Sequence, residues 1–191
     1  MSNTVLVTGS SRGIGAGIAR QLARDGYNLV LHCRSQRDLA DNLAAEIASL
    51  GQKARVLQFD IADREQSRAV LEADIEANGA YYAVVCNAGV TRDNAFPAIP
   101  GEDWDEVLRT NLDGFYNVLQ PLIMPMIRRR QPGRIVTLSS VSGVMGNRGQ
   151  VNYSAALLAV GDIKLQYARL LTETGNFRSE IVGEIALTAA M

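Results

Sequence analysis

The sequence contains few of the residues that form disulfides or bind metal ions. Its 191 residues include two cysteines, Cys33 and Cys86, and a single histidine, His32. Each cysteine ends an apolar, strand-like run, which suits a small buried side chain better than a disulfide framework or a metal site. We interpret His32 as a spectator rather than a base, and no cluster of histidine, cysteine and carboxylate residues predicts a metal site.

Long runs of one kind of residue are also absent. The formal net charge is −1 and no five consecutive residues carry like charges, so the sequence lacks the electrostatic footprint of a protein that binds nucleic acid or an anionic membrane. No apolar stretch approaches the length of a membrane span, and the N-terminus enters a strand pattern without a signal-peptide layout. We therefore expect a cytoplasmic protein without nucleic-acid or membrane partners.

A chain of 191 residues that is 47% hydrophobic and 20% charged is long enough for one domain with a sizeable core. Apolar runs alternate with segments whose apolar residues repeat at a spacing of three to four. This alternation predicts an α/β fold, a doubly wound parallel sheet of the Rossmann type. The expected strands are Thr4–Thr8, Asn28–His32, Ala54–Phe59, Tyr82–Cys86 and Arg134–Leu138, and the expected helices are Ile14–Asp25, Arg37–Leu50, Arg64–Asn78, Trp104–Arg130 with a bend near Pro121 and Pro125, and Asn152 to about Thr172.

The first turn between strand and helix carries the most specific ligand signal. Gly9, Gly13 and Gly15 have a G-x-x-x-G-x-G spacing there. Glycine lets the backbone turn tightly and approach a pyrophosphate, and the N-terminus of the following helix offers unpaired N–H groups to an anion. The pattern predicts a dinucleotide site; the alternative is a strand–helix turn that simply requires glycine.

The residues after the second strand indicate which dinucleotide would bind. An acidic residue there would bind the ribose 2′-hydroxyl, whereas an arginine would accommodate a 2′-phosphate. The sequence reads His32-Cys33-Arg34-Ser35, with no acidic residue before Asp38. Arg34, assisted by Arg12 in the glycine turn, favours NADP(H) over NAD; the alternative is that both arginines are ordinary surface residues.

Several motifs follow one another in order along the chain. They are Thr8-Gly9-Ser10-Ser11-Arg12-Gly13-Ile14-Gly15, Asn87-Ala88-Gly89, Asn111, Ser139-Ser140 and Tyr153-Ser154-Ala155-Ala156. Over about residues 3–156 the chain resembles the short-chain dehydrogenase/reductase family. The resemblance implies a dinucleotide-binding reductase domain at residues 1–156. A divergent tail of the same domain would follow at residues 157–191, without the family's last strand and substrate-covering helices.

The resemblance implies further cofactor contacts. Asp60 would lie near the adenine and Ile61 would contact it through its backbone, while Asn87-Ala88-Gly89 would line the cofactor. An isolated aspartate is also a common helix cap, and asparagine and glycine often end a strand. The full set of expected cofactor-binding residues is Gly9, Ser11, Arg12, Gly13, Ile14, Gly15, Arg34, Asp60, Ile61, Asn87, Ala88, Gly89 and Tyr153.

The resemblance also assigns the chemistry to three polar side chains. Reduction of a ketone by hydride transfer requires a proton donor for the alkoxide and a hydrogen-bond donor that holds the carbonyl. Tyr153 would be the acid, Ser140 the carbonyl partner, and Asn111 the residue that holds a water connecting the site to solvent. Taken singly, these residues are better explained as a buried tyrosine tip, a serine at a strand end and an asparagine within a helix. Their joint order favours the catalytic role.

One position departs from the family pattern. The family carries Tyr-x-x-x-Lys, whereas this chain has Leu157 four residues after Tyr153. Residues four apart share a helix face, about 6 Å apart along the axis, so a lysine would hold the nicotinamide ribose and place positive charge near the tyrosine oxygen. Leucine does neither, and Lys164, roughly 16 Å further along a helix, is no substitute.

The segments at residues 140–147 and 149–153 resemble the 3-oxoacyl-[acyl-carrier-protein] reductase branch of the family. The resemblance implies NADPH-dependent reduction of a 3-oxoacyl thioester in fatty acid biosynthesis. It also implies a homo-oligomer, and we expect a dimer rather than a tetramer. Arg128-Arg129-Arg130 would meet an acidic carrier protein, unless they only complement the dipole of the preceding helix. The alternatives are a catalytically silent NADP-binding or interaction protein of the same fold, or a truncated or frame-altered product.

Overall fold

The computed structural model describes residues 3–160. The strands are β1 (Thr4–Val7), β2 (Asn28–Cys33), β3 (Ala54–Gln58), β4 (Ala83–Cys86) and β5 (Arg134–Thr137). The helices are α1 (Gly13–Arg24), α2 (Arg37–Ser49), α3 (Arg64–Asn78), the 3₁₀ turn η1 (Phe96–Ala98), α4 (Gly101–Leu108), the π-helical segment η2 (Arg109–Asp113), α5 (Gly114–Arg128) and α6 (Val141–Met145). Residues 151–160 are also helical.

The predicted α/β class and the alternation of strands and helices are confirmed. Every expected strand is present, with each end within one residue of the prediction. The helix expected from Asn152 to about Thr172 is present up to residue 160, and its second half lies outside the described residues. The same holds for most of the expected tail at residues 157–191, so the predicted boundary at residue 156 stays a prediction.

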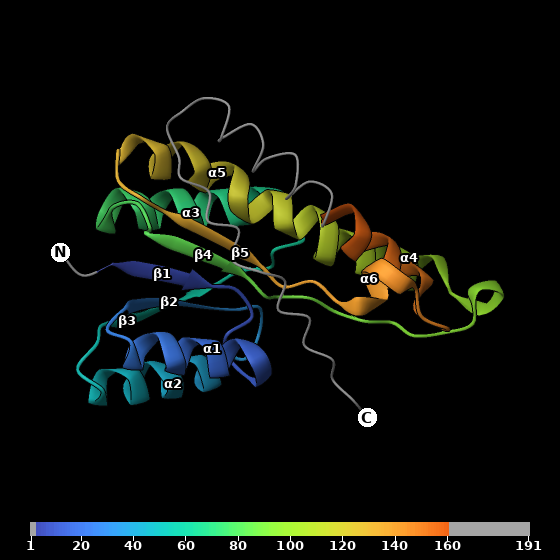
Figure 1. The fold of residues 1–191 in the computed structure, drawn as a ribbon, viewed down its shortest axis with the longest axis horizontal. Coiled ribbons are helices and arrows are strands. Elements are labelled where there is room, and N and C mark those ends of the chain that lie inside the picture. The colour runs from blue at the N-terminus through green and yellow to red at the C-terminus, as the bar shows by residue number, and fades with distance from the viewer. Residues whose placement is uncertain (1–2, 161–191) are drawn as a thin grey trace. The chain divides into compact units, whose positions relative to one another are not determined.

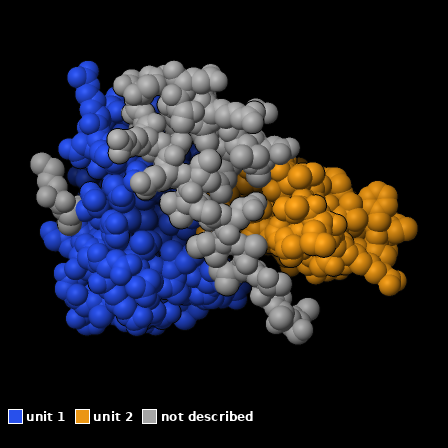
Figure 2. All heavy atoms as spheres, viewed as in Figure 1, with its two compact units in different colours: residues 1–88, 116–136 blue, residues 89–115, 137–191 orange. Residues whose placement is uncertain are grey.

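The chain divides into two compact units, each built from two stretches of sequence. Unit 1 contains residues 1–88 and 116–136, and unit 2 contains residues 89–115 and 137–191 (Figure 2). Unit 1 holds the sheet and the glycine turn. Unit 2 holds α4, η2, α6 and the helix at residues 151–160.

The sheet of unit 1 has the strand order β3-β2-β1-β4-β5, and β1 pairs in parallel with both β2 and β4. Helices α1 and α2 cover one face, and α3 and α5 cover the other (Figure 1). The chain therefore reverses its direction of winding between β1 and β4. In such sheets ligands bind beyond the carboxyl ends of the strands at this point, which is where the glycine turn begins.

Burial on both faces explains why the central strands are apolar at consecutive positions. Val5, Leu6 and Val7 of β1 are all buried, and so are Leu29 and Leu31 of β2. A strand with one solvated face would alternate apolar and polar residues instead. These strands form the rigid frame from which the glycine turn projects.

A buried polar cluster joins β3, α3 and the start of β4. Asp74 of α3 accepts two hydrogen bonds from the Arg55 guanidinium, both at 2.7 Å, and one from the Tyr81 hydroxyl at 2.6 Å. The Asn78 amide donates to Asp74 as well. Because every oxygen of the carboxylate is paired, the buried charge is compensated, as buried charges generally must be.

The helical stretch at residues 101–128 differs in detail from the single helix expected at Trp104–Arg130. It begins at Gly101, after Pro100, with Glu102 and Asp103 in its first turn, where negative charge is favourable. A bend was expected near Pro121 and Pro125, but both prolines lie inside α5. The helical geometry changes earlier, in the π-helical segment η2. Neither η1 nor α6 was predicted, since three and five residues are too few to show a helical period.

Three further features concern binding chemistry in general. No helix within residues 3–160 is both long and apolar enough to cross a membrane. Among the same residues, no group of three or more histidine, cysteine, aspartate or glutamate side chains is arranged to hold a metal ion. Cys33 and Cys86 are free thiols.

Candidate functional site

The glycine turn after β1 approaches the backbone after β4 so closely that side chains do not fit. A Cβ atom on Gly15 would lie 2.5 Å from both the Asn87 amide nitrogen and the Gly9 carbonyl oxygen. A Cβ atom on Gly9 would lie 2.9 Å from the Cα atom of Ala88, and Gly9 has φ +64°. The turn therefore requires glycine at both positions.

Asn87 and Ala88 hold the glycine turn from the side of β4. The Thr8 hydroxyl accepts hydrogen bonds from the Asn87 and Ala88 amides at 2.9 and 3.0 Å. The Asn87 side chain donates to the carbonyl oxygens of Thr8 at 2.8 Å and Gly9 at 3.3 Å. Asn87 thus fixes the conformation of the turn, which is a positioning role that the strand-ending pattern alone does not indicate.

The start of α1 faces solvent. Arg12, Gly13 and Ile14 are exposed, and Arg12 is the N-cap without a side-chain hydrogen bond to the helix. The first amides of a helix have no partner within it. Together with the positive end of the helix dipole, they form a surface that fits the phosphates of a dinucleotide. Ser11 precedes this surface and is half-buried.

His32 contacts the glycine turn from the side of β2. Its Nδ1 atom accepts a hydrogen bond from the Gly9 amide at 3.0 Å, and its Nε2 atom lies 3.0 Å from the carbonyl oxygen of Phe59. This contact is not among those expected for His32, which we interpreted as a spectator. A signal was present: strands that start at residues 4 and 28 in parallel place residue 32 beside residue 8.

The other expected cofactor residues of unit 1 end the neighbouring strands. Arg34 is exposed just after β2. Asp60, just after β3, uses its carboxylate to accept a hydrogen bond from the Ala62 amide at 2.9 Å. The carbonyl oxygen of the buried Ile61 accepts a hydrogen bond from Asn117 at 2.9 Å. Asp60 and Ile61 thus carry structural contacts, and their adenine-binding role stays a prediction.

Gly15→Ala is expected to damage the turn, because the new methyl group would overlap Asn87 and the Gly9 carbonyl. Overpacking of this kind costs about 1–3 kcal/mol of stability, and if the same cost falls on the binding-competent turn, affinity for the expected dinucleotide should fall about 5- to 150-fold, as 1.4 kcal/mol corresponds to a factor of ten. Urea unfolding and a fluorescence titration with NADPH measure the two effects.

Gly17→Ala is the matched control for this change. Gly17 lies in the same helix, and a Cβ atom there meets nothing within 4 Å. It should raise stability by up to about 1 kcal/mol through helix propensity and leave NADPH binding intact. Equal behaviour of the two variants would contradict the proposed close approach.

In unit 2, Ser140 and Tyr153 are brought together. Ser140 caps the N-terminus of α6, and its hydroxyl oxygen accepts a hydrogen bond from the Ser142 amide at 3.2 Å. Burial raises the pKa of the Tyr153 hydroxyl, its hydrogen bond with the Ser140 side chain lowers the pKa in part, and the charge of Asp93 raises it. The net pKa lies above the usual value, so Tyr153 carries its proton at neutral pH.

Asn111 lies within η2, the π-helical segment. Its side-chain oxygen accepts a hydrogen bond from the Val90 amide at 2.9 Å, and its side-chain nitrogen donates to the Val90 carbonyl at 2.8 Å. Single π-helical turns inside α-helices often occur at functional sites. The side chain of Asn111 therefore holds the segment after Gly89, and its expected role in binding a water stays a prediction.

A polar network that was not predicted connects the segment after β4 with the segment before Tyr153. The Gln150 side chain donates to Asp93 at 2.8 Å and accepts from the Ser142 hydroxyl at 3.0 Å. The buried Asn152 donates to the Arg92 carbonyl at 3.2 Å. These contacts fix the loop that leads into Tyr153, and no local pattern in the sequence indicates them.

Leu157 is buried one helical turn after Tyr153, with 7% of its surface exposed. A Cβ atom added to Gly143 of α6 would lie 3.0 Å from the Cβ atom of Leu157, so α6 packs closely on the helix at this position. The place that the family fills with a lysine thus holds an apolar contact.

The run Arg128-Arg129-Arg130 is divided among different surroundings. Arg129 donates a hydrogen bond to the Tyr81 carbonyl at 2.7 Å, and its guanidinium lies 6.0 Å from the centre of the Tyr82 ring. Arg128 ends α5, and Arg128 and Arg130 are exposed. Arg129 therefore contributes to the structure of unit 1, and two arginines remain for the expected contact with a carrier protein.

Comparisons with known proteins agree with the motifs. A family model described as short chain dehydrogenase matches residues 3–181, beyond Ala156, where the motif resemblance ends. A 3-oxoacyl-[acyl-carrier-protein] reductase of Aggregatibacter actinomycetemcomitans is 64% identical over 156 residues, which cover 82% of this chain and 64% of that protein. This chain therefore spans less than two thirds of that relative's length.

More distant relatives are matched over a longer part of the chain. A 3-oxoacyl-[acyl-carrier-protein] reductase of Staphylococcus aureus strain Mu50 is 38% identical over 175 residues, which cover 92% of this chain and 71% of that protein. Nodulation protein G of Azospirillum brasilense is 39% identical over 170 residues, covering 88% of this chain and 68% of that protein.

Proposed function

Because the chain belongs to the short chain dehydrogenase family, we propose that it is an NADPH-dependent reductase of 3-oxoacyl thioesters carried on acyl-carrier protein. Similarity to two 3-oxoacyl-[acyl-carrier-protein] reductases supports the substrate class. The observation that supports the chemistry is that the Ser140 side chain lies close enough to the Tyr153 hydroxyl to lower its pKa, while burial raises that pKa and keeps the hydroxyl protonated at neutral pH.

The proposed roles of the two side chains follow from the charge that develops during reduction. NADPH, when bound, would supply the hydride to the 3-oxo carbon. Tyr153 would donate its proton to the carbonyl oxygen as negative charge builds up on it, and Ser140 would hold that oxygen with its hydroxyl. The raised pKa of Tyr153 keeps the proton in place but also makes it harder to release.

Residues of unit 1 support NADPH as the cofactor. The glycine turn leaves no room for side chains between itself and Asn87, and the start of α1 offers its amides to phosphate. The exposed side chains of Arg12 and Arg34 could bind a 2′-phosphate. The residues directly after β2 include no acid, which would have favoured a free 2′-hydroxyl instead. We expect NADPH to bind more tightly than NADH.

We also propose association between copies of the chain and docking of the acidic carrier protein. Helix α5 exposes Tyr116, Met124 and Ile127, which supports an apolar contact with a second copy. Exposed Arg128 and Arg130 support electrostatic attraction of the carrier. Light scattering coupled to size-exclusion chromatography tests the association between copies. The salt dependence of KM for a carrier-linked substrate tests the docking of the carrier protein.

The test of the function is turnover of a short 3-oxoacyl thioester with NADPH, compared between the unchanged protein and Tyr153→Phe. We expect Tyr153→Phe to reduce kcat by about tenfold, less than the 10²- to 10⁴-fold typical of general acid catalysis, because the cation that would assist Tyr153 is missing. NADPH binding should be retained.

A catalytically silent protein of the same fold is the second candidate, and the buried leucine at position 157 favours it. Such a protein would bind NADPH with the same affinity but show no turnover above that of Tyr153→Phe. Activity clearly above that of the phenylalanine variant would exclude this candidate.

A further inference from the structure

His32 is buried between the glycine turn and the end of β3. It is 2% exposed, and its ring centre lies 4.3 Å from that of Phe59. The Gly9 amide is a donor, so Nδ1 must accept at 3.0 Å, and the Phe59 carbonyl is an acceptor, so Nε2 must carry the hydrogen. Both contacts are satisfied only by the neutral imidazole with its proton on Nε2.

The backbone of His32 extends this contact to the next residue of the turn. The Ser10 amide donates to the His32 carbonyl at 3.0 Å, and the His32 amide donates to the Ser10 hydroxyl at 2.9 Å. The parallel pairing of β1 with β2 ends at Val7 and Leu31. His32 therefore continues the contact between the two strands into the glycine turn, where regular pairing has stopped.

The turn is thus held from two sides, by Asn87 after β4 and by His32 at the end of β2. Asn87 binds the carbonyl oxygens of Thr8 and Gly9, whereas His32 binds the amide of Gly9. Gly9 adopts φ +64°, a conformation in which its amide points to the imidazole. The amide of Gly9 is committed to His32, which leaves the amides that start α1 to face an anion.

The charge state of His32 agrees with this geometry. Burial lowers its pKa to about 4, while the hydrogen bond to Phe59 and the nearby carboxylate of Asp60 oppose the shift. The imidazole therefore stays neutral at physiological pH. A proton on Nδ1 would face the Gly9 amide, and two donors would oppose each other.

We propose that His32 is a positioning residue for dinucleotide binding, because its Nδ1 atom sets the orientation of the Gly9 peptide and through it the path of the glycine turn. The inference rests on the proposed function, since it concerns the same cofactor site. The alternative is that His32 only fills space beside Phe59.

Two variants separate these alternatives, because each keeps one of the two hydrogen bonds. In His32→Asn the side-chain oxygen lies near the place of Nδ1 and can accept from Gly9, but the contact with Phe59 is lost. In His32→Gln the longer side chain can donate to the Phe59 carbonyl, but the Gly9 amide loses its acceptor. The two changes remove similar ring volume, so urea unfolding should show similar losses of stability.

NADPH affinity, measured by fluorescence titration at pH 7.5, is expected to differ between the variants. An unpaired buried donor weakens binding by about tenfold or more, so His32→Gln should bind at least about tenfold more weakly than the unchanged protein. His32→Asn should stay within about threefold of it. Equal affinities in the two variants at equal stability would overturn the positioning role.

Amide exchange of Gly9, followed by NMR without any nucleotide, tests the inference independently of the proposed function. Exchange should be slow in the unchanged protein and in His32→Asn, and at least about tenfold faster in His32→Gln. Protection of Gly9 in His32→Gln would overturn the inference. A lack of NADPH binding by the unchanged protein, with the expected exchange pattern, would overturn the cofactor assignment and leave the role of His32 in the turn supported.

Discussion

Replacing Leu157 by lysine is expected to raise the rate of the proposed reduction of a short 3-oxoacyl thioester by about 10- to 10³-fold, which would bring the contribution of Tyr153 from about tenfold to the 10²- to 10⁴-fold range typical of general acid catalysis. Tyr153 lies one helical turn earlier on the same face, so a lysine at position 157 would bring its ammonium group near the phenol oxygen. Burial and Asp93 both raise the pKa of Tyr153. A neighbouring cation would lower that pKa and stabilise the phenolate that forms as the proton leaves.

The surroundings of Leu157 accept a lysine stem, because the stem is apolar. Leu157 is 7% exposed and packs against Gly143 of α6, and the carbon chain of a lysine would replace that apolar contact. The measurement is kcat at saturating NADPH, together with the pH dependence of the rate. The rate should fall at high pH as Tyr153 loses its proton, and this alkaline limb should move to lower pH as the pKa of Tyr153 falls.

Leu158→Lys is the matched control for this change. Leu158 is 54% exposed and lies on a different face of the helix from Tyr153. Leu158→Lys therefore adds the same positive charge to the protein but does not place it beside the Tyr153 hydroxyl. No increase in rate is expected. If Leu158→Lys increased the rate as much as Leu157→Lys, the increase would come from a general effect of positive charge on substrate binding. That result would contradict a specific effect of the lysine on Tyr153.

The second large effect is expected for Asp74→Ala, which should lower the free energy of unfolding by about 3 kcal/mol. The change removes the acceptor of two hydrogen bonds from Arg55 and one from the Tyr81 hydroxyl. Tyr81 is buried, so its hydroxyl would lose its partner without gaining water. Because Arg55 is 32% exposed and regains some hydration, we expect the lower end of the 3–5 kcal/mol range for broken buried pairs.

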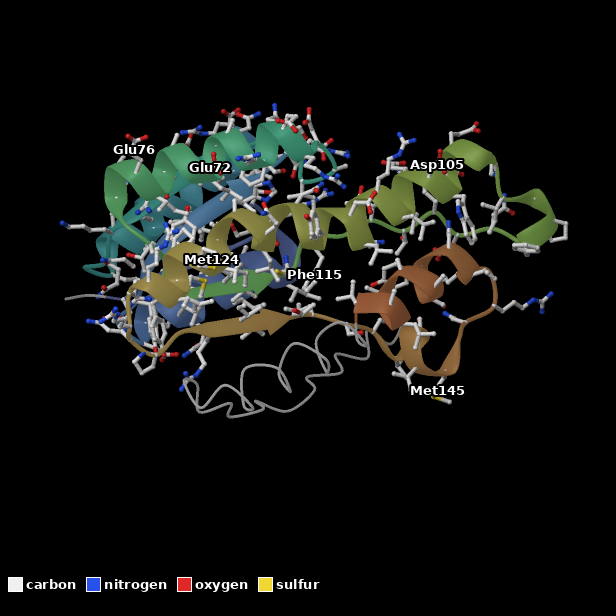
Figure 3. The ribbon with its side chains drawn as sticks, turned by 90° about the horizontal axis from the view of Figure 1, so that it is seen from above. Glu72, Glu76, Asp105, Phe115, Met124 and Met145 are labelled. Carbon is white, nitrogen blue, oxygen red and sulfur yellow. The ribbon has the colours of Figure 1, made fainter. Side chains whose placement is uncertain are left out.

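Urea unfolding at pH 7 measures this loss, and Glu72→Ala provides the control. Glu72 lies on the same helix α3 and points outward (Figure 3), where it pairs with an exposed Arg68. Exposed pairs contribute roughly 0–1 kcal/mol, so the control should be close to the unchanged protein. A comparable loss in both variants would show that the buried cluster around Asp74 contributes no more to the free energy of unfolding than an exposed ion pair does.

Acidification should remove the difference between Asp74→Ala and the unchanged protein. The hydrogen bonds from Arg55 and Tyr81 outweigh the effect of burial, and the pKa of Asp74 in the folded protein lies below its usual value. The stabilisation is therefore fully present above the pKa of the unfolded chain, about 4, and is lost as the pH falls through the folded pKa. The difference between the unfolding curves of the two proteins should therefore shrink progressively as the pH falls below about 4.

Three predictions succeeded from the sequence because each depends on neighbouring residues. The strands were placed to within one residue because consecutive apolar residues mark a strand that is covered on both faces. The glycine turn was recognised because its spacing is local, within seven residues between Gly9 and Gly15. Family membership followed from motifs of the same local kind.

The contacts that complete the site could not be predicted in this way. His32 meets Gly9 across 23 residues of sequence, and Gln150 meets Asp93 across 57. Neither pair belongs to a repeating pattern, since each depends on which strands and loops become neighbours. The π-helical geometry around Asn111 could not be predicted either, because the spacing of apolar residues continues through this segment almost as in an α-helix.

By itself, the sequence determined the order of strands and helices, the glycine turn, and the leucine at the position of the family's lysine, because periodicity and spacing are properties of neighbouring residues. Only the tertiary structure decided that His32 holds the glycine turn, that Asp74 is fully paired and that Gln150 connects Asp93 with Ser142. The physical reason is that a buried polar group must find its partner within reach in space, and which residues come within reach is decided when the strands and helices pack.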